Sequence, residues 1–205
     1  WMATTLAELK NRADVLVLFG TDPEGPFPRF FERFVWPSET LFGQDVAQRQ
    51  VIFLGRAPSG SQATAPDGRA PEVHTCDPEA FPLIAGALAA LANGIALQAD
   101  SVGGISVAVL QSIIDRLKAA QYGVVSWAAG QLDFEHAELT VQRLTKTIVA
   151  LNATTRCVGL PLGGQDGDRT ASQVSAWLSG YPTRVSYQKG YPQYDPYHHS
   201  AERLL

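Results

Sequence analysis

Short apolar runs that end in turns recur along this chain. The clearest is residues 15–19, five consecutive apolar side chains followed by Gly20, Thr21 and Asp22. An unbroken run of this kind is typical of a parallel strand buried on both faces, with the turn at the carboxyl edge of the sheet. Ligands of open α/β sheets bind at that edge, so this turn is the first candidate position for a site. Four similar runs indicate further strands: residues 51–56, 72–76, 123–127 and 156–161.

Helical patterns separate these runs. Residues 105–121 place Val109, Ile113 and Leu117 four apart, which puts them on one face of a helix. An Asp-Pro pair at residues 77–78 predicts the start of another helix, with Asp as the cap and Pro at the first helical position. Further helices are expected over residues 5–12, 29–35, 134–152 and 170–179.

The alternation of strands and helices predicts an α/β fold of Rossmann-like parallel sheets flanked by helices. Adjacent glycines within residues 100–104 indicate a boundary. We therefore expect a first α/β lobe at residues 1–100 and a second at residues 101–205, which ends in an extended C-terminal tail. The chain begins with Trp1 followed by Met2, so we expect upstream sequence to be missing.

Composition narrows the class of protein. A net charge of −4, with charges of both signs scattered, gives no reason to expect nucleic acid or a membrane surface as a partner. The most apolar stretch, residues 81–99, is interrupted by glycine and polar residues and indicates a core helix and a loop rather than a membrane span. Cys76 and Cys157 lie far apart, outside any CxxC spacing, so neither a zinc knuckle nor an iron–sulfur site is indicated. The sequence shows no signal peptide, and a cytoplasmic protein is expected.

No catalytic group or metal site stands out. Residues 163–168 lie between a strand and a helix, where backbone N–H groups can receive an anion. This loop lacks both the GxGxxG order and a P-loop ending, and its two aspartates repel phosphate, which favours a plain turn. His74 and Cys76 share a strand face, but no further ligand lies at a recognised spacing, which favours core packing. No GxSxG elbow or cysteine protease signature supports nucleophilic catalysis.

Two segments resemble a known family. Residues 12–23 resemble the "ADV…WG-x-NP" strand and loop of molybdopterin and tungstopterin oxidoreductases. Residues 179–185 and 189–196 are similar to the "TGYP…V…RGYPRYNP" ending of the B subunit of formylmethanofuran dehydrogenase. The order of elements between these segments is compatible, so the resemblance spans most of the chain. It implies two lobes like the central domains of molybdopterin oxidoreductases.

The departures from this family fall where it binds its pterin cofactor. The first loop has Asp22 where the family has an asparagine. The second strand ends without the acid of the family's Asp-Pro-Arg and has Arg56 near that position. The family's later Arg-Gly is Gly-Gly here, at residues 163–164. The family's iron–sulfur and metal-ligating cysteines lie upstream and have no counterpart here. Each lost charge-assisted contact is worth ~1.5–3 kcal/mol, so we expect degenerate loops that bind no cofactor and no metal. These remnant loops comprise Gly20, Thr21, Asp22, Gly55, Arg56, Gly163, Gly164 and Gln165.

The resemblance to the degenerate B subunit of the bacterial formyltransferase/hydrolase complex implies a role in the one-carbon metabolism of methylotrophy. It implies a non-catalytic structural subunit of a hetero-oligomer that moves a formyl group from tetrahydromethanopterin to a furan-type carrier and hydrolyses it to formate. The implied partners are the hydrolase (A), C and formyltransferase (D) subunits, of which the hydrolase carries the catalytic metal. Whether this chain has activity of its own stays open. The alternative is an active tungsten- or molybdenum-pterin formylmethanofuran dehydrogenase subunit whose missing ligands lie upstream.

A further hypothesis gives the old cofactor crevice a new ligand, the acidic polyglutamyl arm of the furan carrier. Arg29, Arg56 and Arg169 lie in or just after sheet-edge loops, where they can pair with carboxylates. The tyrosines of the tail are candidate anchors for partner subunits, and a tail folded against its own domain is the equal alternative. These tyrosines are Tyr187, Tyr191, Tyr194 and Tyr197.

Overall fold

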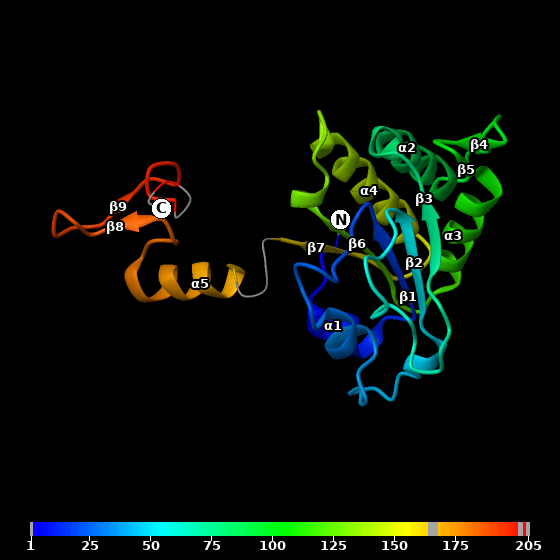
Figure 1. Cartoon of the computed structure of the whole chain (residues 1–205). Helices are drawn as coiled ribbons and strands as arrows, with labels where there is room; N and C mark the ends of the chain where they lie inside the picture. The colour runs from blue at the N-terminus through cyan, green and yellow to red at the C-terminus, as the bar shows by residue number, and fades with distance from the viewer. Residues whose placement is uncertain (1, 164–167, 201–202, 204–205) are drawn as a thin grey trace. The chain divides into compact units, whose positions relative to one another are not determined.

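Five parallel strands form the central sheet of the computed structural model, which describes residues 2–163, 168–200 and 203 (Figure 1). Their spatial order is β3-β2-β1-β6-β7, so the chain starts in the middle, builds one side, and then crosses to the other side of β1. This is the Rossmann strand order, and the expected Rossmann-like α/β fold is confirmed. The strands are β1 (Val15–Phe19), β2 (Gln50–Gly55), β3 (Glu72–Thr75), β6 (Gly123–Ala128) and β7 (Cys157–Leu162).

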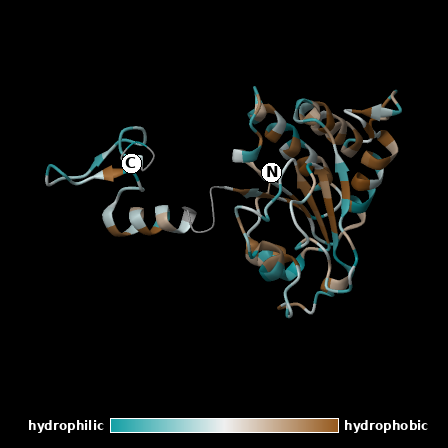
Figure 2. Ribbon diagram, in the orientation of Figure 1, coloured by the Kyte–Doolittle hydropathy of each residue, from teal (hydrophilic) through white to brown (hydrophobic). Residues whose placement is uncertain are grey.

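The central strands are buried on both faces because each face packs against its own hydrophobic cluster. Successive side chains of a strand point to opposite faces, so Val15 and Val17 join one cluster while Leu16 and Leu18 join the other. All five residues of β1 are buried. Figure 2 shows the central strands of the sheet in brown, the colour of hydrophobic residues.

Helices cover both faces of the sheet (Figure 1). The cluster with Val15 is closed by α2 (Phe81–Ala92), α3 (Val107–Ala119) and α4 (Ala137–Leu151). The opposite cluster is closed by α1 (Leu6–Arg12) and a π-helical turn, η1 (Phe31–Val35). Short 3₁₀ turns connect these elements: η2 (Val46–Gln48), η3 (Pro78–Ala80) and η4 (Ala129–Gln131).

The expected boundary between residues 100 and 101 differs from the structure, because strands from both sides of that position pair in the same sheet. The adjacent glycines instead form a tight hairpin between β4 (Ser101–Val102) and β5 (Ile105–Ser106). Gly103 and Gly104 both have positive φ, +59° and +82°, as the favoured two-residue hairpin turn requires.

The chain divides instead after β7, into the units Trp1–Leu162 and Gly163–Leu205. The second unit contains α5 (Asp168–Ser179) and a small antiparallel hairpin of β8 (Val185–Ser186) and β9 (Gln193–Tyr194). The tail that the sequence indicated as extended therefore carries its own short hairpin. Across the residues that the structure describes, no helix is long and apolar enough to cross a membrane.

Candidate functional site at the carboxyl edge of the sheet

The two glycines that end β1 and β2 lie against Phe81. Gly20 and Gly55 have positive φ, +58° and +101°, and an added Cβ would lie 2.7 Å and 2.8 Å from the Phe81 ring. Phe81 is 1% exposed and packs edge-on against the rings of Phe19 and Phe134. Phe81, the first residue of α2, therefore fills the space beyond the two strand ends. Its close approach, together with the positive φ angles, explains why glycine occupies both positions.

The crevice between β1 and β6 is the topological switch point of the sheet, where ligands of this fold class bind. Gln131, from the turn after β6, spans it. The Gln131 side-chain oxygen accepts hydrogen bonds from Thr21 Oγ1 and from the backbone N–H of Asp22, both at 2.8 Å, and its Nε2 donates to the Asp22 carbonyl at 2.8 Å. Thr21 is fully buried and Asp22 is 8% exposed. This amide pairing joins the two strand ends directly.

Two acidic side chains hold the loop that follows β2. Asp22 accepts from the backbone N–H groups of Glu24 at 3.0 Å and Ser59 at 2.9 Å. Glu24, 6% exposed, accepts from the backbone N–H of Ala63 at 3.1 Å. Backbone N–H groups at a strand edge are the usual donors to a phosphate. Here those of Asp22, Glu24, Ser59 and Ala63 are bonded to the chain's own side chains.

The three predicted arginines are not brought together by any contact among the described residues. Arg56 is exposed beside the crevice, and its Nη2 donates to the Gln131 carbonyl at 3.4 Å. Arg29 forms an exposed ion pair with Glu32 at 2.6 Å, which raises the pKa of the guanidinium and lowers that of the carboxyl. The Arg169 side chain, and the predicted Gly164 and Gln165, lie outside the described residues. Gly163 follows the end of β7 and is half-buried.

His74 and Cys76, the pair considered for a metal, have separate environments. His74 Nε2 lies 2.6 Å from a carboxylate oxygen of Glu72. Burial, and secondarily Asp77, raises the pKa of the Cys76 thiol to about 11, so it is a thiol at neutral pH. No group of three or more His, Cys, Asp or Glu within the described ranges is placed to hold a metal ion.

The described residues at this edge leave few free donors for a pterin dinucleotide. Its phosphates need cationic side chains or free N–H donors. The described edge offers one exposed cation, Arg56, while the buried carboxylates of Asp22 and Glu24 accept from its backbone N–H groups. Phe81 packs against the glycines Gly20 and Gly55. Sequence reasoning identified the loops but missed the residues that fill them. Gln131 lies in a short turn after β6 and shows no local signal of its role, since its partners are about 110 positions away.

The fold and this edge define an α/β protein of the Rossmann-like class with a self-filled switch-point crevice. No family model matches the chain. Comparison with known proteins finds homologues that carry two different names. The B subunit of tungsten-containing formylmethanofuran dehydrogenase 2 from Methanococcus maripaludis is 29% identical over 195 residues, which is 94% of this chain and 44% of that protein. The protein of the same name from Methanocaldococcus jannaschii is 27% identical over 202 residues, 98% of this chain and 45% of that protein.

The second name belongs to a protein of Methylorubrum extorquens. The B subunit of the formyltransferase/hydrolase complex Fhc from Methylorubrum extorquens is 29% identical over all 205 residues, 51% of that protein. A crystal structure of the M. extorquens complex FhcABCD with methylofuran contains a protein chain with a TM-score of 0.59 and 28% identity, covering 99% of this chain and 51% of that one. The predicted resemblance to the B subunits of formylmethanofuran dehydrogenase and of the Fhc complex is confirmed. This chain spans about half the length of the relatives it matches.

Proposed function

We propose that this chain is a non-catalytic structural subunit of a formyltransferase/hydrolase complex that converts formyl-tetrahydromethanopterin to formate through a furan-type carrier. The observation that carries this proposal is the self-filled crevice at the carboxyl edge of β1 and β6. Gln131 closes it with three hydrogen bonds of 2.8 Å, and Thr21 beneath is fully buried.

The energetics of this edge oppose a bound pterin dinucleotide. A phosphate there would have to displace carboxylates that already hold backbone N–H groups, and each lost charge-assisted hydrogen bond costs ~1.5–3 kcal/mol. It would also lie close to Asp22 and Glu24, which are buried and acidic. A retained fold with a filled cofactor crevice supports a role in holding partner subunits together. In this proposal, partner subunits carry out the hydrolysis and the formyl transfer.

The second unit supports a role in assembly. Its exposed side chains include Trp177 at 85% and Leu178 at 80%, both on α5. Tyr187, Tyr191 and Tyr194 are each about half exposed. Aromatic side chains are enriched at protein–protein interfaces, so this unit is the proposed contact surface for partner subunits. Contact of Arg29, Arg56 and Arg169 with carboxylates of the furan carrier stays a prediction.

The alternative is an active tungsten- or molybdenum-pterin oxidoreductase subunit. It is favoured by the two relatives with "tungsten-containing" in their names, whose identity to this chain is about the same as that of the Fhc relative.

Metal analysis of the intact complex purified with this chain separates the two proposals, run beside a formate-release assay without an electron acceptor. The structural role predicts formate release with no stoichiometric tungsten, molybdenum or iron–sulfur. Stoichiometric tungsten or molybdenum would establish the oxidoreductase instead. The assembly role has its own test, because a chain that stays monomeric in a mixture with the hydrolase, C and formyltransferase subunits is not a scaffold.

A further inference from the structure

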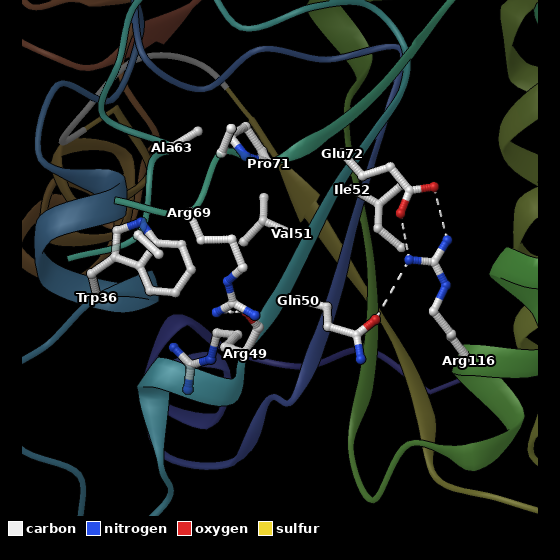
Figure 3. A pocket seen from close by; sticks show the side chains of 12 residues that line it. Trp36, Arg49, Gln50, Val51, Ile52, Ala63, Arg69, Pro71, Glu72 and Arg116 are labelled. Atoms are coloured by element: carbon white, nitrogen blue, oxygen red, sulfur yellow. Dashed lines mark hydrogen bonds and ion pairs between the residues drawn. The ribbon is translucent and has the colours of Figure 1, made fainter. Parts of the chain in front are cut away.

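A pocket lies at the opposite edge of the sheet from the crevice, where β2 and β3 begin (Figure 3). Its volume is about 130 Å³. Apolar side chains, among them Val51, Ala63 and Pro71, form part of its wall, and the indole of Trp36 forms another part. Arg69, which lines the pocket, is exposed, so the pocket is open to solvent.

Arg69 supplies this pocket with free hydrogen-bond donors. It uses Nη2 alone, donating to the carbonyl of Ala47 and, at 3.0 Å, to the carbonyl of Arg49. Among the described contacts, its Nε and Nη1 donate to nothing, so an anionic acceptor that enters the pocket can bind them. Trp36 contributes its indole ring to the wall; its Nε1 is buried and does not open into the pocket.

The pocket also has an excess of positive charge. Arg49 is 1% exposed and donates to backbone carbonyls, those of Lys10, Ala13, Phe34 and Val35. These bonds satisfy its donors, and the carboxylate of Asp14 acts on it only through space, without a contact. The one lining carboxylate, Glu72, is held by Arg116 at 2.5 Å and 2.9 Å (Figure 3). Arg49 and Arg69 therefore face the pocket without a carboxylate in contact.

The geometry points to a site for one carboxylate on a short aliphatic stem, which would accept from Arg69 while its stem packs on Val51, Ala63 and Pro71 beside the ring of Trp36. The size fits, because a cavity of ~150 Å³ holds benzene and this one holds a ligand of about six heavy atoms. Guanidinium groups and apolar walls select a carboxylate over a cation or a neutral amide. A free organic acid and a glutamate side chain of another protein both carry this chemistry.

The test follows the Trp36 indole N–H by ¹H–¹⁵N NMR of the full chain, with the resonance assigned by Trp36→Phe. Butyrate is the free acid, N-acetylglutamate amide presents the same carboxylate as a side chain, and butyramide is the neutral isostere. A saturable shift of the Trp36 resonance, with a Kd of about 10 mM or tighter, is expected for at least one carboxylate. Saturation by butyrate identifies a free acid, and saturation by the glutamate derivative alone identifies a side chain.

Matched variants complete the test. Arg69→Gln keeps the stem of an exposed residue and should weaken binding about tenfold or more, since it removes a charge-assisted bond. Arg29→Gln, at another exposed arginine outside the pocket, should leave the Kd unchanged. The proposal is overturned if neither carboxylate gives a saturable shift, if butyramide binds as well, or if Arg69→Gln binds with the wild-type Kd.

Discussion

Gly20 and Gly55 end neighbouring strands with left-handed backbone angles, and the ring of Phe81 lies against both. In dinucleotide-binding folds, glycines at this edge let the backbone approach a phosphate. In this chain an aromatic side chain occupies that position. Glycines at the carboxyl edge of the sheet therefore allow core packing in this chain rather than the approach of a phosphate.

Gly20→Ala should destabilise the fold by about 2–5 kcal/mol. A left-handed angle costs an L-residue roughly 1–2 kcal/mol, and overpacking a core adds about 1–3 kcal/mol. The new methyl group would lie 2.7 Å from Phe81 and 2.8 Å from Leu132, both buried. Urea unfolding of the two proteins measures the difference in the free energy of unfolding.

Two variants separate the causes of this loss. Gly25→Ala has open space around the new Cβ and should change stability by less than about 0.5 kcal/mol. Phe81→Leu should recover part of the loss when combined with Gly20→Ala, because the smaller side chain relieves the clash. A Gly20→Ala protein as stable as wild type would mean that Phe81 does not pack against the strand end.

Among the elements, the buried strands were predictable and the connections between them were not. The run at residues 15–19 coincides with β1, and the strand expected at residues 51–56 is displaced by one residue from β2. Uninterrupted apolar runs specify such strands because both faces are covered. The helix expected at residues 29–35 is instead a π-helical turn confined to Phe31–Val35.

The filling of the crevice was not predictable, because it depends on contacts distant in sequence. The loops at Gly20 and Gly55 were identified as remnant sites through the resemblance to the pterin oxidoreductases. Gln131 lies between the strand expected at residues 123–127 and the helix expected at residues 134–152, where no local pattern distinguishes it. Phe81 is an ordinary apolar residue at the start of an apolar helix. Arg49, at a strand entrance, gives no local signal that it is almost fully buried. Only the three-dimensional pairing of elements assigns these roles.

The edge strand β3 is tied to α3 by an ion pair, and this contact makes stability depend on pH. Hydrogen bonding to Arg116 lowers the pKa of Glu72 to about 2, with His74 a weaker cause in the same direction. Because folding lowers the pKa of Glu72, the ionised carboxyl stabilises the fold at every pH above its ordinary pKa. This stabilisation is lost as pH falls from about 5 towards 2. Since 36% of the Glu72 side chain is exposed, solvent screening reduces the effect.

Glu72→Gln should therefore lower Tm at pH 7 and flatten its acid dependence between pH 6 and pH 3. After the discount for exposure, the loss at pH 7 should be on the order of 2–4 °C, the shift that about 1 kcal/mol gives in a domain of this size. Thermal melts of both proteins across this range measure it. Glu39→Gln, at an exposed position outside this ion pair, is the control and should parallel wild type. Parallel curves for Glu72→Gln as well would remove the ion pair as a source of acid sensitivity.

At the scale of the whole molecule, the two units differ in how much buried core they contain. Both hydrophobic clusters lie entirely within Trp1–Leu162, together with every strand of the parallel sheet. The described residues of the unit Gly163–Leu205 contribute to neither cluster, and large apolar side chains such as Val174 and Trp177 on α5 are exposed. A domain's independent stability depends on its buried core, so the first unit should fold without the second.

Deletion of residues 163–205 should therefore leave cooperative unfolding and the circular dichroism of the sheet, but abolish co-purification with the hydrolase, C and formyltransferase subunits. The fold persists because the deletion removes no cluster side chain, and assembly fails because the proposed contact surface is gone. Trp177→Ser in the full chain is the matched test, since a side chain 85% exposed contributes little to stability but much to a contact. It should weaken co-purification about tenfold or more. A truncated chain that assembles like wild type would place the partner contacts on the first unit instead.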